Sequence, residues 1–187
     1  MQLESLIASI AIDAKENRDV ATADVAGAYL KTEMKDFVIV KVAGESSNIM
    51  CKVNPTFKKF ITWERRKPVI YMRLKKALYG CMQSALLWYD TFKQQLEKDG
   101  FVLNPYDPCV ANKDIKGKQC TILWYVDDSK VSHEDSRVVT SVIESIEKRF
   151  GKMTVTRGRR QTFVGMNITY NDDQTASIDM KDYIVGV

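Results

Sequence analysis

Apolar residues recur every three or four positions in three segments of the chain, and this spacing predicts three amphipathic helices. The first helix covers residues 3–17. The second begins near Ser84 and ends before Gly100, a residue type that commonly follows the last turn of a helix. The third covers residues 135–150, with Asp135 or Ser136 as its N-terminal cap. Each helix therefore has one apolar face to bury against the rest of the fold.

Between the helices, short runs rich in β-branched and aromatic residues predict strands. The run "KQCTILWYVDDSKVSH" is expected to form a β-hairpin with its turn at or near Asp127 and Asp128. The stretch between Pro55 and Pro68 is expected to be an irregular, basic excursion. Further strands are predicted at residues 19–24, 36–42, 69–74, 153–156, 162–170 and 175–180. Strands mixed with long helices predict an α+β fold, an antiparallel sheet with helices packed on one face.

The composition is that of an ordinary globular protein, and it excludes several kinds of site. The 187 residues, 45% hydrophobic and 28% charged, suit one domain or a compact domain with a short appendage. The sequence contains no run of 18 apolar residues, so no membrane span is predicted. The acidic residues of the first helix argue against a signal peptide. Four cysteines without CxxC spacing are typical of reduced thiols in an intracellular protein. With His133 as the one histidine, the remaining metal chemistry is that of carboxylates, which select Mg²⁺, Mn²⁺ or Ca²⁺.

The net charge of +4 is unevenly distributed along the chain. One basic cluster is interleaved with aromatic residues, a mixture that suits a phosphate backbone and its bases. The alternative is that these side chains form an ordinary solvated face. The cluster consists of Lys58, Lys59, Arg65, Arg66 and Lys67, with Phe57, Phe60 and Trp63 between them.

Two adjacent aspartates, Asp127 and Asp128, interrupt the apolar run "ILWYV". Burying an unpaired carboxylate costs several kcal/mol, and a neighbouring carboxylate adds repulsion. Because Asp24 also ends an apolar strand, a sheet could bring all three together to hold two divalent ions about 3.5–4 Å apart for phosphoryl transfer. The alternative is that the doublet is only a hairpin turn, where aspartate is common.

Several motifs resemble those of the reverse transcriptases of copia-type long-terminal-repeat retrotransposons. "YVDD" (125–128) is similar to the YxDD box of that family, and "DVAGAYL" (24–30) is similar to its first catalytic motif. "LYGCMQSALLWY" (78–89), "GFVLNPYDPCV" (100–110) and "FVGMNI" (163–168) resemble three further segments, in family order. The stretch "GKMTVTRGRRQTFVG" (151–165) departs from the family pattern by being more basic. The resemblance implies a polymerase palm fold and covers nearly the whole chain.

The same resemblance implies the roles of individual residues. Asp24, Asp127 and Asp128 would be catalytic and, with the backbone carbonyl of Val25, would bind two Mg²⁺ or Mn²⁺ ions. Tyr29 would be the steric gate against a 2′-hydroxyl, or alternatively an aromatic core residue. The implied nucleotide-binding residues are Ala28, Tyr29, Tyr79, Gly80, Gln83 and Lys152, although Lys152 also fits an ordinary surface lysine. The implied primer or template contacts are Tyr125, Ser84, Phe163, Val164, Gly165 and Met166.

The implied function is RNA-directed and DNA-directed DNA polymerase activity. Its partners would be a template with a DNA primer and deoxynucleoside triphosphates, in the cytoplasm or a virus-like particle, with no membrane and the oligomeric state left open. Residues 1–180 would form a palm core with a partial fingers insertion at about 43–70, lacking most of the fingers and the thumb, and residues 181–187 would begin a truncated thumb or connection. The alternatives are a palm that only binds primer–template and, less favoured, a palm-fold nucleotide cyclase.

Overall fold

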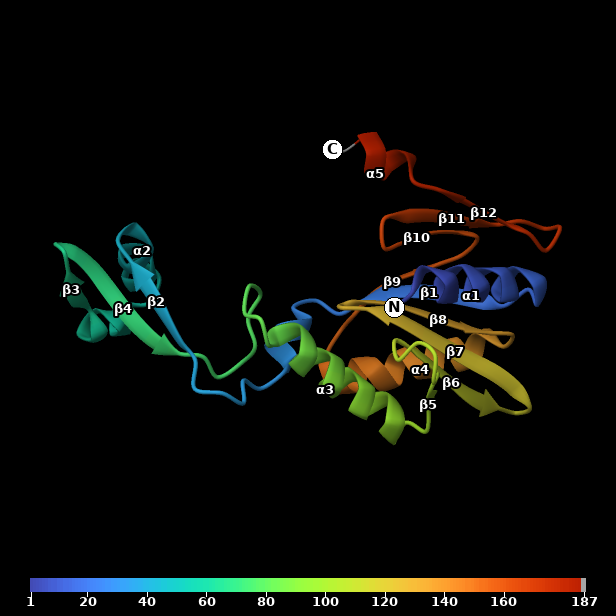
Figure 1. The fold of residues 1–187 in the computed structure, drawn as a ribbon, viewed down its shortest axis with the longest axis horizontal. Coiled ribbons are helices and arrows are strands. Elements are labelled where there is room, and N and C mark those ends of the chain that lie inside the picture. Colours follow the sequence, from blue (N-terminus) through green and yellow to red (C-terminus); the bar gives the residue numbers. More distant parts are fainter. Residues whose placement is uncertain (186–187) are drawn as a thin grey trace. The chain divides into compact units, whose positions relative to one another are not determined.

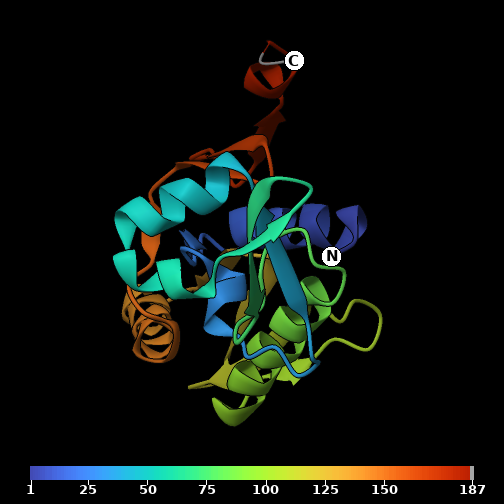
Figure 2. The same cartoon turned by 90° about the vertical axis from the view of Figure 1, so that its left-hand side faces the viewer.

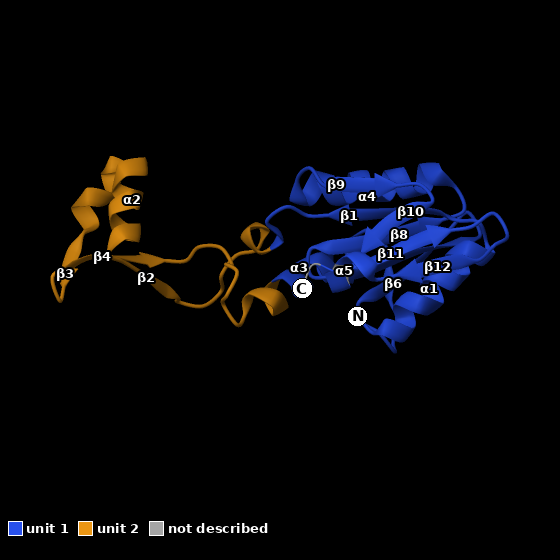
Figure 3. Cartoon of the chain, turned by 90° about the horizontal axis from the view of Figure 1, so that it is seen from above, with its two compact units in different colours: residues 1–28, 88–187 blue, residues 29–87 orange. Residues whose placement is uncertain are grey.

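The computed structural model describes residues 1–185 and divides the chain into two compact units (Figures 1 and 3). Unit 1 holds Met1–Ala28 and Trp88–Val187, and unit 2 is the intervening segment Tyr29–Leu87. Unit 1 is thus built from two distant parts of the sequence. No helix within residues 1–185 combines the length and apolarity needed to cross a bilayer.

The centre of unit 1, within its described residues, is a six-stranded sheet with the order β5-β6-β7-β8-β1-β9. All neighbouring strands are antiparallel, which confirms the predicted α+β class and the predicted hairpin at residues 118–133. The strands are β1 (Asp19–Asp24), β5 (Val102–Leu103), β6 (Val110–Ile115), β7 (Lys118–Tyr125), β8 (Asp128–His133) and β9 (Thr154–Arg157).

Helices α3 (Ser84–Lys98) and α4 (Ser136–Phe150) pack on one face of this sheet, close to their predicted bounds (Figure 1). An aromatic layer fills the space between them and the sheet. The ring centroids of Trp88 and Phe150 are 5.0 Å apart, and those of Phe92 and Trp124 of β7 are 5.5 Å apart. Asp135 caps α4 by accepting a hydrogen bond from the Arg137 backbone N–H.

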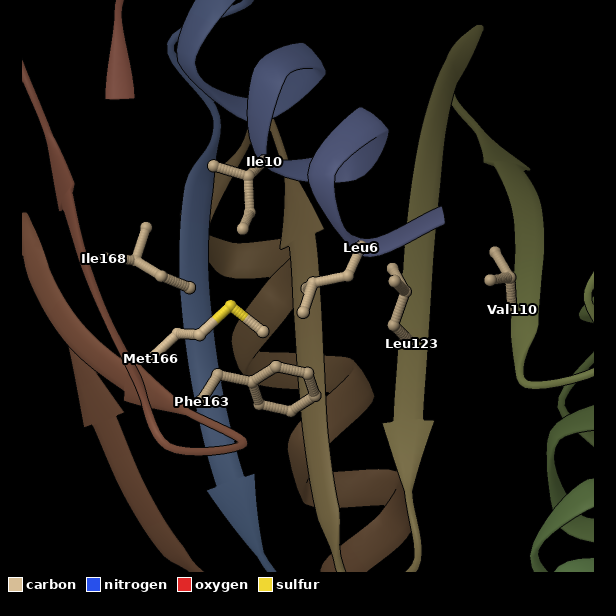
Figure 4. Packing of buried hydrophobic residues seen from close by; sticks show 7 residues of the cluster. All are labelled: Leu6, Ile10, Val110, Leu123, Phe163, Met166 and Ile168. Atoms are coloured by element: carbon tan, nitrogen blue, oxygen red, sulfur yellow. The ribbon is translucent and has the colours of Figure 1, made fainter. Parts of the chain in front are cut away.

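The opposite face is covered by α1 (Leu3–Lys15) and by a second, three-stranded sheet, β10-β11-β12 (Figure 4). Leu6 and Ile10 of α1 join one buried cluster with Phe163, Met166 and Ile168. The helices therefore do not all lie on one face: α3 and α4 do, and α1 does not. Burial explains this, because adjacent residues of β7 are buried on both faces and each face needs a cover. The strands are β10 (Arg160–Phe163), β11 (Met166–Tyr170) and β12 (Ala176–Asp179), followed by α5 (Lys181–Val185).

Unit 2 contains its own three-stranded sheet, with the order β2-β4-β3 (Figure 2). The excursion expected to be irregular contains a 3₁₀ helix and a strand, and the β3–β4 turn at its tip consists of Arg65 and Arg66, both with positive φ. A helix that the sequence did not predict lies between β2 and the 3₁₀ helix. The elements are β2 (Ile39–Ala43), α2 (Glu45–Val53), η2 (Pro55–Phe60), β3 (Thr62–Glu64) and β4 (Lys67–Arg73), while η1 (Ala28–Lys31) lies at the start of the unit.

Candidate active site

The aspartate doublet lies at a two-residue turn between β7 and β8, where Tyr125 pairs with Asp128. Val126 occupies the turn with a φ of 56°, in the left-handed region that a β-branched residue rarely adopts. Such strain persists only where the surroundings hold it, and it is concentrated at functional sites. Two hydrogen bonds hold this turn: the Val25 N–H donates to the Asp127 carbonyl at 3.1 Å, and the Trp88 indole N–H donates to the Val126 carbonyl at 2.5 Å.

The register of the sheet brings the third carboxylate to the same edge. Asp24 is the last residue of β1 and pairs directly with Asp128, the first residue of β8. Directly paired residues project from the same face of a sheet, so these two carboxylates are neighbours, and Asp127 adjoins them in the turn. Three acidic side chains predicted from sequence segments about a hundred residues apart therefore meet at one edge, which we call the carboxylate edge (Asp24, Asp127 and Asp128).

The electrostatics of the carboxylate edge are unfavourable in the protein alone. Burial raises the pKa of Asp128 above its ordinary value, and the negative charges of Asp127 and Asp24 raise it further. Burial and then the charge of Asp127 raise the pKa of Asp24 in the same direction. A bound cation would relieve this repulsion.

The donor chemistry of the edge fits a divalent ion, because Mg²⁺ and Mn²⁺ prefer oxygen ligands. The three carboxylates are not arranged around a common metal position. Within residues 1–185, no three acidic, cysteine or histidine side chains are grouped closely enough to hold an ion. Val25, whose carbonyl is the fourth predicted ligand, follows Asp24 and is buried. The edge thus offers suitable ligands that would have to close around a cation.

Lys152 is exposed and precedes β9 by two residues. Thr154, the first residue of β9, pairs with Asp24. At about 3.3 Å per residue, this connection places the Lys152 backbone near the same end of the sheet as the carboxylate edge. This exposed position fits an ordinary surface lysine as well as one that contacts a ligand at the carboxylate edge.

The predicted nucleotide-binding residues lie mostly in unit 2. The rings of Tyr29 and Tyr79 are in contact, tilted by 32° with centroids 4.3 Å apart, although the two residues are fifty positions apart in the sequence. Gly80 follows with a φ of 90°, a conformation that glycine adopts without strain. Gln83 is exposed, whereas Ala28, the last residue of the first segment of unit 1, is fully buried. The structure brings Tyr29 and Tyr79 together within unit 2.

The predicted primer and template residues have contrasting environments. Tyr125 is half exposed next to the doublet, whereas Phe163 and Met166 are buried in the cluster with α1. Val164 and Gly165 form the β10–β11 turn, both with positive φ as a type I′ turn requires. Ser84 is fully buried, and its hydroxyl donates to the Leu78 carbonyl at 2.7 Å. Contacts with a nucleic acid are therefore open to Tyr125 and to the β10–β11 turn, while the side chains of Phe163, Met166 and Ser84 hold the structure.

Comparison with known proteins agrees with this geometry. A family model described as "Reverse transcriptase (RNA-dependent DNA polymerase)" matches residues 1–187. The chain belongs to this family. The resemblance predicted from the sequence motifs is confirmed.

Curated relatives of this reverse transcriptase family member come from Saccharomyces cerevisiae. The putative transposon Ty5-1 protein is 24% identical over 161 residues, which are 86% of this chain and 46% of that protein. The transposon Ty1-DR5 Gag-Pol polyprotein is 22% identical over 187 residues, 95% of this chain and 9% of the polyprotein. The chain thus spans less than half the length of these retrotransposon proteins.

Two solved telomerase structures are also similar in fold. One is telomerase from Candida albicans in complex with a fragment of telomeric RNA, with a TM-score of 0.48 and 13% identity over 96% of this chain and 36% of that chain. The other is apo telomerase from Candida tropicalis, with a TM-score of 0.49 and 12% identity over 95% of this chain and 40% of that chain.

Trp88 is a residue of the candidate site that the sequence did not predict. Trp88 looks like a core residue from its position on the apolar face of α3, and it is indeed 1% exposed. Its indole N–H, however, donates to Val126 in the strained turn, 38 residues away in sequence. A buried tryptophan normally finds a partner for this group, which is a signal that a partner exists but not which one.

Proposed function

We propose that this chain is the palm of an RNA-directed and DNA-directed DNA polymerase that adds deoxynucleotides to a primer 3′-hydroxyl. The observation that carries the proposal is the pairing of Asp24 with Asp128 at a sheet edge, beside Asp127 in a strained turn. Membership of the reverse transcriptase family supports the same reaction. Metal-dependent incorporation of nucleotides into a primer, abolished by removing the doublet, is the experiment that tests it.

Individual residues of the chain would have distinct roles in this reaction. Asp24, Asp127 and Asp128, with the Val25 carbonyl, would hold two Mg²⁺ or Mn²⁺ ions. When bound, these ions would supply an activated primer hydroxyl and charge stabilisation for the leaving pyrophosphate. Tyr125 and the β10–β11 turn would contact the primer end, and Lys152 would donate a proton or a positive charge to the pyrophosphate. Trp88 would keep the doublet in its turn.

The domain boundaries remain part of the proposal. Residues 1–180 would be the palm, with a fingers insertion at about 43–70 that lies inside unit 2. Residues 181–187 would begin a thumb or connection, of which 186 and 187 lie outside the described residues. The four cysteines have free thiols in the structure, and burial raises the pKa of Cys120 to about 12, so this thiol is inert. The proposed place of action is the cytoplasm or a particle inside a cell.

Tyr29 would select deoxyribose by occupying the space of a 2′-hydroxyl. Replacing Tyr29 with alanine should lower discrimination against ribonucleotides at least about tenfold, because the steric barrier is removed. The measurement is the ratio of kcat/KM for a deoxynucleotide and the matching ribonucleotide. Tyr79→Ala is the matched control, because it removes the stacking partner and leaves the gate. Unchanged discrimination in Tyr29→Ala would show that Tyr29 is only a packing residue.

The basic cluster of unit 2 would bind nucleic acid or the triphosphate. The turn residues Arg65 and Arg66 are exposed, and the adjacent Trp63 is 71% exposed. An exposed indole beside cations is suited to stacking on a base. Four substitutions to alanine, at Lys58, Lys59, Arg65 and Arg66, should weaken primer–template binding and make it less sensitive to salt.

The expected change in the salt dependence of primer–template binding can be stated as a number. Each phosphate that the variant no longer neutralises should reduce the slope of log K against log salt by about 0.7 to 0.9. The control is a second four-site variant in which exposed lysines outside the cluster are replaced with alanine, namely Lys98, Lys116, Lys148 and Lys181. Equal slopes for the wild-type chain and the cluster variant would rule out the cluster as a nucleic-acid contact.

Two alternatives make different predictions. A palm that binds primer–template without catalysis would bind in a salt-sensitive way but incorporate no nucleotide. A nucleotide cyclase would also use paired aspartates on a hairpin, but it would convert a triphosphate without primer or template. The Tyr29–Tyr79 ring contact and the β10–β11 turn have no use in a cyclase, and they favour the polymerase.

A further inference from the structure

A fully buried lysine lies two residues after the catalytic doublet. Lys130 of β8 has no exposed side-chain area, and its ammonium forms an ion pair with Asp13 of α1. The same ammonium donates to the Ser9 hydroxyl at 2.8 Å, and the Tyr170 hydroxyl of β11 donates to the Asp13 carboxylate at 3.5 Å. One buried polar cluster, Ser9, Asp13, Lys130 and Tyr170, thus joins α1 and the second sheet to the strand that carries Asp128.

The position of Lys130 relative to the carboxylate edge is fixed by the strand. Side chains two residues apart on a strand project from the same face, so Lys130 and Asp128 share the face that α1 covers. Their backbones are about 6.6 Å apart, within reach of a four-carbon lysine side chain. Asp24, paired with Asp128, lies on that face too. Asp13, Asp24 and Asp128 could therefore each form an ion pair with the buried Lys130 ammonium. In the structure, the ion pair is with Asp13.

The charges around Lys130 affect which carboxylate pairs with its ammonium. Arg18, which acts electrostatically on Lys130, lies before β1, at the opposite end of that strand from Asp24. Arg18 is itself paired with Glu16 at 2.7 Å, so its charge is partly balanced. Without Asp13, the ammonium would have no counterion on α1, and Asp24 and Asp128 are the carboxylates on its own face of the sheet. Stability alone does not explain the pair, because a buried ion pair is often no more stable than apolar residues of the same volume.

We propose that Asp13 is a positioning residue of the active site, which holds the Lys130 ammonium on α1 and so leaves Asp24 and Asp128 to bind divalent cations. This inference rests on the proposed function, since it assigns the carboxylate edge to metal binding. It predicts that Lys130 becomes an inhibitor of metal binding when its counterion is removed. The sequence of the doublet gives no sign of this, because the counterion lies 117 residues away.

The experiment compares Mn²⁺ binding by the whole chain and its variants. Mn²⁺ is titrated while the melting temperature and the heat of binding are recorded, and primer extension is followed at the same concentrations. Asp13→Asn keeps the shape of the side chain and removes its charge. It should raise the Mn²⁺ concentration at half-effect about tenfold, as expected when an ammonium a few ångströms from the ligands loses its counterion.

A second variant separates positioning from folding. Adding Lys130→Met to Asp13→Asn removes the unpaired ammonium and should return the Mn²⁺ midpoint to within about twofold of the wild-type value. Tyr170→Phe, which breaks another hydrogen bond to Asp13 and leaves the ion pair, is the matched control and should not move the midpoint. A merely structural pair would lower the melting temperature in Asp13→Asn without moving the Mn²⁺ midpoint, and that result would overturn the inference.

The outcomes also distinguish this inference from the proposed function. A wild-type chain that responds to Mn²⁺, with Asp128→Asn abolishing the response, and an unshifted Asp13→Asn would overturn the inference alone. A Mn²⁺ midpoint that stays raised when Lys130→Met is added to Asp13→Asn would also overturn the inference alone. A wild-type chain indifferent to Mn²⁺ in both readouts would overturn the proposed function and the inference together.

Discussion

Replacing Asp128 with asparagine should make the metal-free protein more stable while abolishing primer extension. Burial and the charges of Asp127 and Asp24 raise the pKa of the Asp128 carboxyl, so its ionised form is disfavoured in the folded state at neutral pH. Asparagine removes that charge and keeps the shape. Because Asp128 is partly exposed, solvent screening limits the expected gain to about 0.5–1 kcal/mol.

The loss of activity should be much larger than the gain in stability. Metal ligands contribute several kcal/mol of charge stabilisation in the transition state, so extension should fall at least about a thousandfold. Urea unfolding in the presence of a chelator measures the first effect, and single-nucleotide extension measures the second. Added Mn²⁺ should raise the melting temperature of the wild-type chain more than that of Asp128→Asn.

Asp114 supplies a matched control for this prediction. It lies near the end of β6, and its carboxylate accepts a hydrogen bond from the Gly117 N–H of the following turn at 2.9 Å. Asp114→Asn changes an aspartate that only supports a hairpin turn and should leave extension at the wild-type rate. If Asp128→Asn behaved in the same way, the doublet would be only a hairpin turn.

Replacing Trp88 with phenylalanine should reduce extension by about tenfold and lower the free energy of unfolding by about 1–3 kcal/mol. Phenylalanine keeps an aromatic ring in the layer with Phe150 but removes the donor to the Val126 carbonyl. The strained turn would then lose one of the two hydrogen bonds that hold it, and the doublet would be less well positioned.

Phe92→Leu separates this effect from a loss of packing. Phe92 contacts the same aromatic layer and is equally buried, and its ring makes no hydrogen bond to the turn. It should cost similar stability, about 1–2 kcal/mol, with less effect on extension. Equal losses of extension in the two variants, at equal loss of stability, would show that the Trp88 hydrogen bond has no role in the site.

The sequence predicted the elements of this fold better than their arrangement. The three long helices occur close to their expected bounds because their apolar spacing is local and regular. The spacing identifies a face to bury but not its partner, so the place of α1 on the face opposite α3 and α4 was not predicted. The β10–β11 turn at Val164 and Gly165 likewise divides what composition alone suggested was one strand.

The candidate site shows the same division. Asp24, Asp127 and Asp128 stood out because carboxylates at the ends of apolar strands are costly, and the structure brings them to one edge. Trp88, Asp13 and Lys130 were missed because their significance lies in contacts with residues far away in the sequence. A buried indole or ammonium usually has a partner, but only the folded chain shows which partner Trp88 and Lys130 have.

The most direct test of the central claim is primer extension by the chain on an RNA template, first with Mg²⁺ and then with Mn²⁺, beside the variant Asp127→Asn/Asp128→Asn. We expect extension that needs a divalent ion and disappears in the variant, while both proteins bind the primer–template. Extension that survives in the variant would contradict the assignment of the carboxylate edge as the active site. Salt-sensitive binding with no extension by the wild-type chain would contradict the proposed activity and favour a palm that only binds.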